Sequence, residues 1–214
     1  MPVLEPGKIR NVAVVGHRGA GKTSLVEAML FQSGAVNRLG SVEGSSTVSD
    51  WDDDEHKRQL SLQTTPCYVN WDGRKINLID TPGDAGFSGD RIAAMRVVEG
   101  ALIVVSGVLG VEVGTGRAWH RAARLGLARV LCINMLDRER ADFLRTLDAV
   151  RAQFSERCVA VHLPIGAEHD VSGIVDVLHM KAYAIPPGGK EGAPIPIPDD
   201  MAALVDEHRK RLLD

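Results

Sequence analysis

A glycine-flanked turn at residues 16–23 constrains this chain more than any other feature. It reads Gly-His-Arg-Gly-Ala-Gly-Lys-Thr, between an apolar, strand-like run (9–15) and a helical pattern (24–32). In this spacing the backbone N–H groups converge on the phosphates of a nucleotide, the lysine reaches the β and γ oxygens, and the threonine hydroxyl can ligate Mg²⁺. The positive end of the helix that follows also attracts the phosphates. The flanking strand and helix favour a phosphate-binding loop over a glycine-rich turn without a ligand. We therefore predict that a nucleoside triphosphate binds to Gly16, His17, Arg18, Gly19, Ala20, Gly21, Lys22 and Thr23.

Composition narrows the class of protein. The 214 residues are 44% hydrophobic, enough for the core of one α/β domain and an incomplete appendage. A formal charge of −3, from 25 basic and 28 acidic side chains, gives no overall attraction to nucleic acid or membranes. Three separated cysteines in or beside apolar stretches are typical of small core residues in a reducing compartment. Because the sequence has no apolar leader and no run of membrane-spanning length, we expect a cytoplasmic protein with no membrane partner.

Strand-like and helical patterns alternate up to about residue 163. Such alternation predicts an α/β fold with a mostly parallel sheet and helices on both faces. A two-residue turn at Asp72-Gly73 makes the second strand an antiparallel edge, and the long polar segment 33–64 is expected to be a functional or mobile loop. The expected strands are 11–15, 68–71, 76–79, 102–105, 130–133 and 159–163, and the expected helices are 24–32, 90–99, 115–125 and 140–154.

The pattern changes after Leu163. A short apolar segment (174–185) leads into Pro186-Pro187-Gly188-Gly189 and then a proline-rich run (193–198). Neither can sustain a helix or a central strand. A last helical pattern covers 199–213, and its amphipathic face is left incomplete at the chain end.

Two further motifs stand at the ends of expected strands. Asp80-Thr81-Pro82-Gly83 offers a carboxylate that can hold the Mg²⁺ shell through water and a glycine N–H that can meet a γ-phosphate. Asn134-Met135-Leu136-Asp137 offers an aspartate that can accept hydrogen bonds from the ring N–H and the amine of guanine, a donor pair that adenine lacks. Each motif alone has a structural alternative, a turn or a helix N-cap. Three strand-end motifs in this order favour a GTPase.

Several motifs together carry a family resemblance. They are Arg10-Asn11-Val12, Gly16-His17, Asp50-Trp51, Arg58, residues 76–83, Trp119, Asp137-Arg138, residues 141–143 and residues 163–168. In this combination the chain resembles the G domain of bacterial elongation factor G from about Ile9 to its end. The resemblance implies a P-loop GTPase G domain, GTP or GDP with Mg²⁺, and the ribosome as a partner. It also implies a G-domain core over residues 1–166 and the beginning of an inserted subdomain over residues 167–214.

The sequence departs from the family pattern at positions that bear on hydrolysis. Asp84 stands where the family has a histidine that positions the attacking water, and a γ-phosphate would repel its charge by about 3 kcal/mol at ~5 Å in an effective dielectric constant of ~20. Gly19 and Gly86 stand at acidic positions of the family, and Gln59 stands at a glycine. Ser61 replaces a threonine but keeps a hydroxyl for Mg²⁺. These changes spare the phosphate cradle.

The base-recognition motif is also altered. Met135 replaces a lysine whose stem packs on the base, and a flexible thioether can still do so, while Asp137 keeps the discriminating carboxylate. The family's last guanine-contact turn, of the Ser-Ala-Leu type, is not reached before Asp214. We therefore expect the N-terminal fragment of a longer factor, or a gene broken there.

Two functions from different classes remain open. The first is a translational GTPase that is slow unless its partner rearranges the site, and the second is a GTP-binding regulatory switch with little or no hydrolysis. The guanine motif argues against a third, an unrelated P-loop ATPase or kinase. The expected catalytic residues are Lys22 and Asp84, the expected Mg²⁺ ligands are Thr23, Ser61 and, through water, Asp80, and the remaining expected GTP contacts are Thr81, Pro82, Gly83, Asn134, Met135, Leu136 and Asp137.

Other charged groups are ambiguous in the sequence. Arg117, Arg121 and Arg124 recur at helical spacing and form either an RNA-facing patch or a solvated helix face. The acidic run 52–55 favours a loop surface over a metal site. No histidine shows ligand spacing with cysteine, so no metal cluster is expected. His17 either lines the phosphate loop or packs it.

Overall fold

The computed structural model describes residues 5–185 and 192–214, so Pro186-Pro187-Gly188-Gly189 lies outside the described residues. The chain forms two compact units, and each is described by itself. The first comprises Met1–Val105 and Glu112–Asn134, and the second comprises Ser106–Val111 and Met135–Asp214. Within the described ranges, every helix is too short or too polar to cross a membrane.

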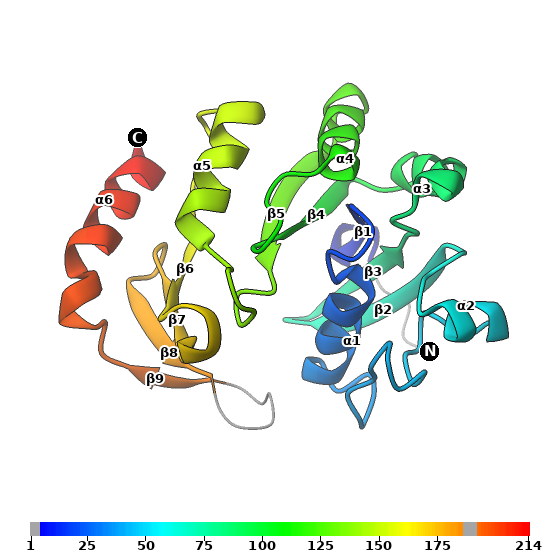
Figure 1. Ribbon diagram of the computed structural model, residues 1–214, viewed down its shortest axis with the longest axis horizontal. Helices are drawn as coiled ribbons and strands as arrows, with labels where there is room; N and C mark the ends of the chain where they lie inside the picture. Colours follow the sequence, from blue (N-terminus) through cyan, green and yellow to red (C-terminus); the bar gives the residue numbers. More distant parts are fainter. Residues whose placement is uncertain (1–4, 186–191) are drawn as a thin grey trace. The chain divides into compact units, whose positions relative to one another are not determined.

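A five-stranded sheet forms the first unit, as the alternating pattern predicts (Figure 1). The strand order is β2-β3-β1-β4-β5, and β1 pairs in parallel with both β3 and β4. The chain passes from β1 to the β2–β3 hairpin on one side of β1 and then crosses from β3 to β4 on the other side. Ligands of such sheets bind at the carboxyl ends of the strands, where the strand order reverses. The strands are β1 (Ile9–Gly16), β2 (Thr65–Trp71), β3 (Arg74–Asp80), β4 (Gly100–Ser106) and β5 (Ala128–Asn134).

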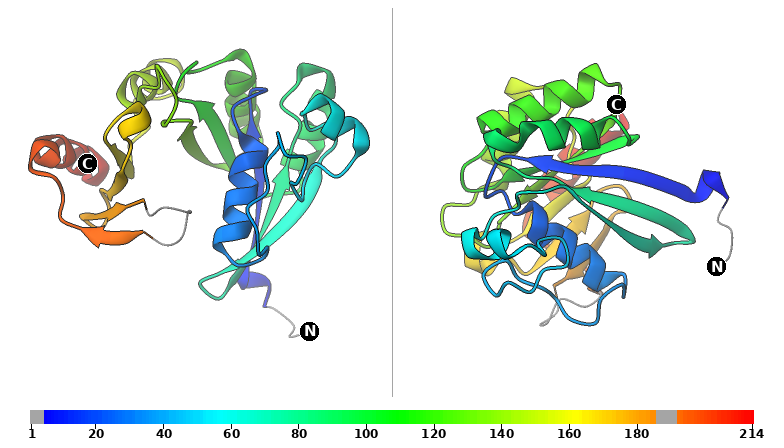
Figure 2. Two further views of the ribbon diagram at one scale, coloured as in Figure 1. Left: turned by 60° about the horizontal axis from the view of Figure 1, so that its bottom comes forward. Right: turned by 90° about the vertical axis from the view of Figure 1, so that its right-hand side faces the viewer.

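Helices cover both faces of this sheet (Figure 2). Helix α1 packs on β1, β2 and β3, whereas α3 and α4 pack on β1 from the other face. Aliphatic side chains of α1 and the sheet, such as Val26, Leu30 and Leu78, fill the core on the α1 side. The helices are α1 (Lys22–Gln32), α2 (Asp53–Arg58), α3 (Ser88–Met95) and α4 (Val113–Arg124), with short 3₁₀ turns η1 (Pro6–Lys8) and η2 (Ala85–Phe87).

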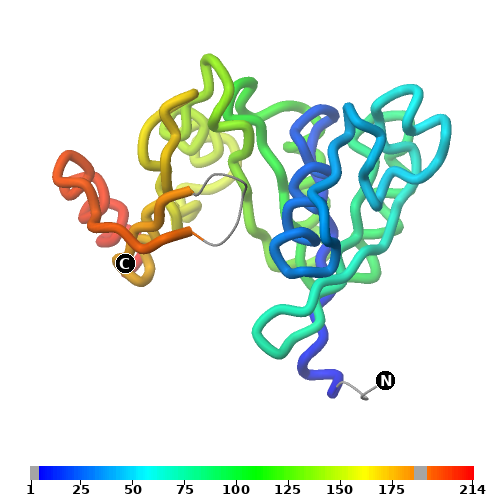
Figure 3. Tube along the Cα trace, turned by 90° about the horizontal axis from the view of Figure 1, so that it is seen from below, coloured from blue at the N-terminus to red at the C-terminus, as the bar shows by residue number. Residues whose placement is uncertain are grey.

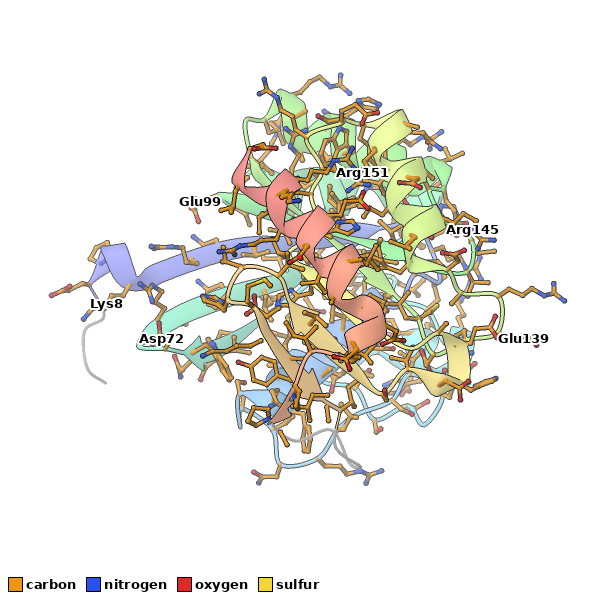
Figure 4. The ribbon with its side chains drawn as sticks, turned by 90° about the vertical axis from the view of Figure 1, so that its left-hand side faces the viewer. Lys8, Asp72, Glu99, Glu139, Arg145 and Arg151 are labelled. Atoms are coloured by element: carbon orange, nitrogen blue, oxygen red, sulfur yellow. The ribbon has the colours of Figure 1, made fainter. Side chains whose placement is uncertain are left out.

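The predicted hairpin and its antiparallel edge strand are confirmed. Strand β2 pairs with β3 through Trp71 opposite Arg74, and the two turn residues Asp72 and Gly73 have positive φ, 47° and 69°. Figure 4 shows Asp72 at the tip of this hairpin. A turn with both central residues in this region matches the right-handed twist of the flanking strands.

Helix α3 ends earlier than the sequence predicts. The pattern suggested a helix to residue 99, but α3 stops at Met95. Glu99 instead fastens the chain to β1, because its carboxylate accepts hydrogen bonds from the Asn11 backbone N–H at 3.0 Å and side-chain amide at 3.1 Å. The residues after Met95 are therefore used to turn the chain into β4.

The long segment between α1 and β2, traced from blue to cyan in Figure 3, is fastened by two buried carboxylates. Glu27 accepts the Val48 N–H at 2.6 Å. Glu55 accepts four backbone N–H groups, from residues 51, 52, 62 and 63, at 2.8 to 3.2 Å. The segment also contains α2, which Asp52 and Glu55 begin as a reciprocal capping box.

The second unit contains a four-stranded antiparallel sheet, in the order β6-β7-β8-β9. The expectation that residues 159–163 add a strand to the alternating, mostly parallel pattern is wrong, because β6 starts at His162 and pairs antiparallel with β7. The predicted boundary after Gly166 falls between these two strands, inside this unit. The elements are α5 (Phe143–Gln153), β6 (His162–Ile165), η3 (Glu168–Asp170), β7 (Gly173–Asp176), β8 (Lys181–Ala184), β9 (Ala193–Ile195), η4 (Asp199–Met201) and α6 (Ala202–Leu213).

Candidate functional site

The loop after β1 has the backbone conformation of a phosphate cradle. Gly19 and Gly21 have φ of 77° and 84°, a left-handed region that glycine adopts without a steric penalty. Gly21 is the residue before α1, so the first N–H groups of that helix open toward the loop. Oriented backbone N–H groups at a helix N-terminus bind anions.

Lys22 lies across this loop. Its ammonium donates to the His17 carbonyl at 3.0 Å, and only 6% of the residue is exposed. Burial lowers the pKa of Lys22, whereas the Asp80 carboxylate raises it. Gly83 lies against the same group, because a Cβ at Gly83 would clash with Lys22 Nζ and the Arg18 backbone. The Asp-Thr-Pro-Gly turn and the phosphate loop therefore meet at the lysine.

Three oxygen-bearing side chains converge beside Lys22. Thr23 Oγ1 donates to Asp80 Oδ2 at 2.8 Å and lies 2.9 Å from Ser61 Oγ, and all three residues are buried. Asp80 Oδ1 is enclosed without a hydrogen-bond partner. Burial raises the pKa of Asp80 to about 6, although the Thr23 hydrogen bond and the Lys22 charge lower it. These residues come from α1, the segment before β2, and the end of β3.

The donor set fits a hydrated Mg²⁺. Magnesium prefers hard oxygen ligands at about 2.0–2.1 Å in an octahedron, so neighbouring ligands stand ~3 Å apart. The separation of 2.9 Å between Thr23 Oγ1 and Ser61 Oγ agrees with such an edge. The unpartnered Asp80 oxygen offers an acceptor for metal-bound water. Among residues 5–185 and 192–214, no group of three His, Cys, Asp or Glu side chains is arranged to hold a metal ion.

A second acidic residue, Asp50, is not among the site residues predicted from the sequence. It is 3% exposed, and burial raises its pKa while the Ser61 hydroxyl and the Lys22 charge lower it. The only sequence signal was its place in the Asp50-Trp51 pair of the family resemblance. Its carboxyl adds negative charge beside Ser61 and Lys22.

Asp84 is held on one side by the loop and on the other by its own turn. Its Oδ2 lies 3.4 Å from Arg18 Nη1, and its Oδ1 accepts the Gly86 N–H at 2.8 Å. The second contact makes Asp84 the N-cap of η2. Both carboxylate oxygens are therefore engaged at the position where the family resemblance places a water-positioning histidine.

Three other predicted contacts have structural roles. His17 Nδ1 accepts the Gly114 N–H at 3.2 Å, and its Nε2 lies 3.3 Å from Glu112 Oε1, so the ring joins the loop to the start of α4. Thr81 Oγ1 donates to the Val14 carbonyl at 2.7 Å and ties β3 to β1. Pro82 is buried, as are its chain neighbours Thr81 and Gly83.

The residues of the predicted base-recognition motif are divided between the two units. Asn134, at the end of β5, donates from its amide to the Ala20 carbonyl at 3.0 Å, which supports the phosphate loop. Met135, Leu136 and Asp137 belong to the second unit. Met135 has a φ of 62°, and Asp137 is exposed with no hydrogen bond or ion pair to any described residue. Its carboxylate is thus available to a ligand.

Comparisons with known proteins agree with these features. Residues 7–196 match the family model described as Elongation factor Tu GTP binding domain. Elongation factor G of Granulibacter bethesdensis is 37% identical over 216 residues, covering 100% of this chain and 31% of that protein. Elongation factor G of Mycoplasma pneumoniae is 34% identical over 206 residues, covering 96% of this chain and 30% of that protein.

A solved structure is similar as well. A crystal structure of a protein from Thermus thermophilus has a TM-score of 0.91 and 34% identity, and the match covers 96% of this chain and 31% of that one. This chain spans about a third of the length of the relatives it matches. The predicted resemblance to elongation factor G is confirmed, and the chain belongs to the family of elongation factor Tu GTP-binding domains.

Proposed function

We propose that this chain binds GTP and GDP with Mg²⁺ and hydrolyses GTP, as the nucleotide-binding part of a cytoplasmic translation factor that acts on the ribosome. The observation that carries this proposal is the convergence of Lys22, Thr23, Ser61 and Asp80 beside the phosphate loop. The ribosomal role is supported by relatives named elongation factor G, of which this chain matches about a third.

The phosphates are held by the backbone of Gly16 to Gly21 and by Lys22. Thr23 and Ser61 would ligate Mg²⁺ directly, and Asp80 would hold it through water. When bound, the ion withdraws negative charge from the β and γ oxygens. Lys22 stabilises charge on the same oxygens, and because it is buried, its interaction with phosphate is stronger than it would be in water.

Guanine recognition is assigned to the second motif. Asp137 would accept hydrogen bonds from the ring N–H and the exocyclic amine of guanine, while the Met135 and Leu136 segment would border the base. Asn134 supports the site through its hydrogen bond to the phosphate loop. The same carboxylate finds no matching donor pair on adenine, so GTP and GDP are preferred over ATP and ADP.

Hydrolysis requires a water that attacks the γ-phosphorus in line. The new P–O bond forms as the bond to the β–γ bridging oxygen breaks, the electron pair leaves on GDP, and the water proton passes to solvent or phosphate. Asp84 stands at the positioning place, but Arg18 and the Gly86 N–H engage both of its oxygens. We infer slow hydrolysis until the partner rearranges this contact.

The same contact supports a second candidate function. A protein whose Asp84 stays bound to Arg18 would change shape with GTP but scarcely cleave it, and would act as a regulatory switch. The two candidates share one nucleotide site and differ only in the fate of the γ-phosphate.

Single-turnover phosphate release with and without ribosomes distinguishes them. The proposal predicts slow release by the parent alone and faster release with ribosomes, and Asp84→His is expected to be faster than the parent in both conditions. A Lys22→Ala variant gives the background. No acceleration by ribosomes in the parent supports the switch, and no gain in Asp84→His shows that Asp84 does not limit the rate.

A further inference from the structure

Helix α4 begins with an acidic residue whose side chain does not cap the helix. Glu112 is the N-cap of α4, the position whose side chain can accept a hydrogen bond from an N–H group of the first turn, but its carboxylate accepts none there. Instead, Glu112 Oε1 lies 3.3 Å from Nε2 of His17 in the phosphate loop. The side chain is only 21% exposed. The carboxylate is therefore used by the loop and not by its own helix.

The His17 ring is held at both of its nitrogens. Nδ1 accepts the Gly114 N–H at 3.2 Å, so the neutral ring carries its proton on Nε2, beside the Glu112 carboxylate. Gly114 also packs closely against the ring, because a Cβ at this position would lie 2.7 Å from His17 Nδ1 and 2.9 Å from His17 Cα. Two residues at the start of α4 therefore fix one side chain of the phosphate loop.

The same histidine holds the lysine of the loop through its backbone. Lys22 Nζ donates to the His17 carbonyl at 3.0 Å, and Lys22 is buried. An ammonium has three N–H donors, so one fixed acceptor leaves two donors in defined directions. Because the His17 ring is anchored, its carbonyl also keeps its place. Donors that are already oriented bind an anion more strongly than donors that must first be ordered.

We propose that Glu112 is a positioning residue of the nucleotide site, which holds His17 and, through the His17 carbonyl, orients Lys22 toward the phosphates. This inference rests on the proposed binding of GDP and GTP, and it assigns Glu112 no contact with the nucleotide. The charge of Glu112 acts in the opposite direction, because removal of a negative charge near an anion site strengthens anion binding. Weaker GDP binding without Glu112 is therefore evidence of lost orientation and not of altered charge.

Titration calorimetry of the 214-residue chain with GDP and Mg²⁺ compares the parent, Glu112→Ala, Glu112→Gln and, as a control, Glu43→Ala, an exposed glutamate of the same unit. Glu112→Ala is expected to raise the Kd for GDP roughly fivefold, the effect of losing one hydrogen bond. Glu112→Gln keeps an oxygen that can accept the Nε2 proton and should bind GDP as tightly as the parent or more tightly. Glu43→Ala should match the parent. A loss in Glu112→Gln equal to that in Glu112→Ala would contradict the proposal.

A double-mutant cycle tests the route through His17. His17→Ala should weaken GDP binding at least as much as Glu112→Ala, and combining the two substitutions should cause no further loss. Additive losses would exclude this route. If Glu112 only stabilised α4, its replacement would lower the Tm without nucleotide and leave the Kd for GDP unchanged.

Gly114→Ala is a second perturbation that leaves Glu112 in place and does not depend on the folding of Glu112→Ala. The new methyl group displaces the His17 ring, whereas alanine favours a helix more than glycine does. The Kd for GDP is therefore expected to rise without loss of helix stability. Parent-like GDP binding by Gly114→Ala, or by folded Glu112→Ala, overturns the proposal. Failure of the parent itself to bind GDP would instead refute the proposed function on which the inference rests.

Discussion

Replacement of Asp80 by asparagine is expected to have opposite effects on the stability of the protein without ligand and on its binding of Mg²⁺. The carboxyl is 2% exposed and has a pKa of about 6, raised by burial from its ordinary 3.8. Asparagine has nearly the same shape and can still accept the Thr23 hydrogen bond. It cannot ionise, so the substitution removes a buried charge without creating a cavity.

The magnitude follows from the pKa difference. Between pH 3.8 and 6 the folded chain binds a proton at Asp80 that the unfolded chain has lost, so the free energy of unfolding falls as pH rises through this window. At 1.36 kcal/mol per pKa unit, the free energy of unfolding of the parent falls by roughly 3 kcal/mol as pH rises through this window. The free energy of unfolding of Asp80→Asn does not fall by this amount. The variant therefore gains relative stability as pH rises, while its binding of Mg²⁺ with GDP weakens.

Urea unfolding in EDTA from about pH 4 to 7.5 measures the first effect, and the rise in Tm on adding Mg²⁺ and GDP at about pH 7.5 measures the second. Asp142→Asn provides a control, because Asp142 is an exposed N-cap whose side chain accepts a hydrogen bond from the Arg145 N–H of its own helix, α5. If the free energies of unfolding of the parent and of Asp80→Asn changed in parallel with pH, the reasoning would be contradicted. An undiminished response of the variant to Mg²⁺ would remove Asp80 from the metal site.

Three further predictions concern the loop and the base. Glu55→Ala leaves four backbone N–H groups without their acceptor and should lower the free energy of unfolding by about 3 kcal/mol or more. Urea unfolding measures this loss against the exposed control Asp54→Ala, and equal stability of the two variants would refute the prediction. Gln59→Gly relieves a left-handed residue (φ 49°) at the end of α2 and should stabilise the chain by about 0.5–1 kcal/mol in the same assay, whereas a loss would show that the Gln59 side chain makes a compensating contact. Asp137→Asn should reduce the preference for GDP over ADP in competition binding at least tenfold, and an unchanged ratio would assign base recognition to other residues.

Local sequence signals predict the sheet of the first unit well. The strands around the phosphate loop combine apolar runs with motifs at their ends, and these features depend on a few neighbouring residues. The hairpin at Asp72-Gly73 was predictable for the same reason. Helix α2 was missed although Asp52 and Glu55 are spaced as a capping box, because the charged run was interpreted only as loop surface.

Features that depend on long-range contacts could not be predicted. Strand β6 pairs with β7 in a separate sheet, and its apolar pattern does not specify which partner it takes. After α3 ends at Met95, Glu99 contacts Asn11, a residue far away in the chain. The burial of Arg91 and Asp50 likewise results from tertiary packing, which no local period specifies.

Isothermal titration calorimetry of the 214-residue chain tests the central claim most directly, with GDP and ADP titrated in the presence of Mg²⁺. The account predicts heat and saturable binding with GDP, much weaker binding with ADP, and loss of GDP binding in Lys22→Ala. Absence of GDP binding by the folded parent chain, or equal binding of GDP and ADP, would contradict it.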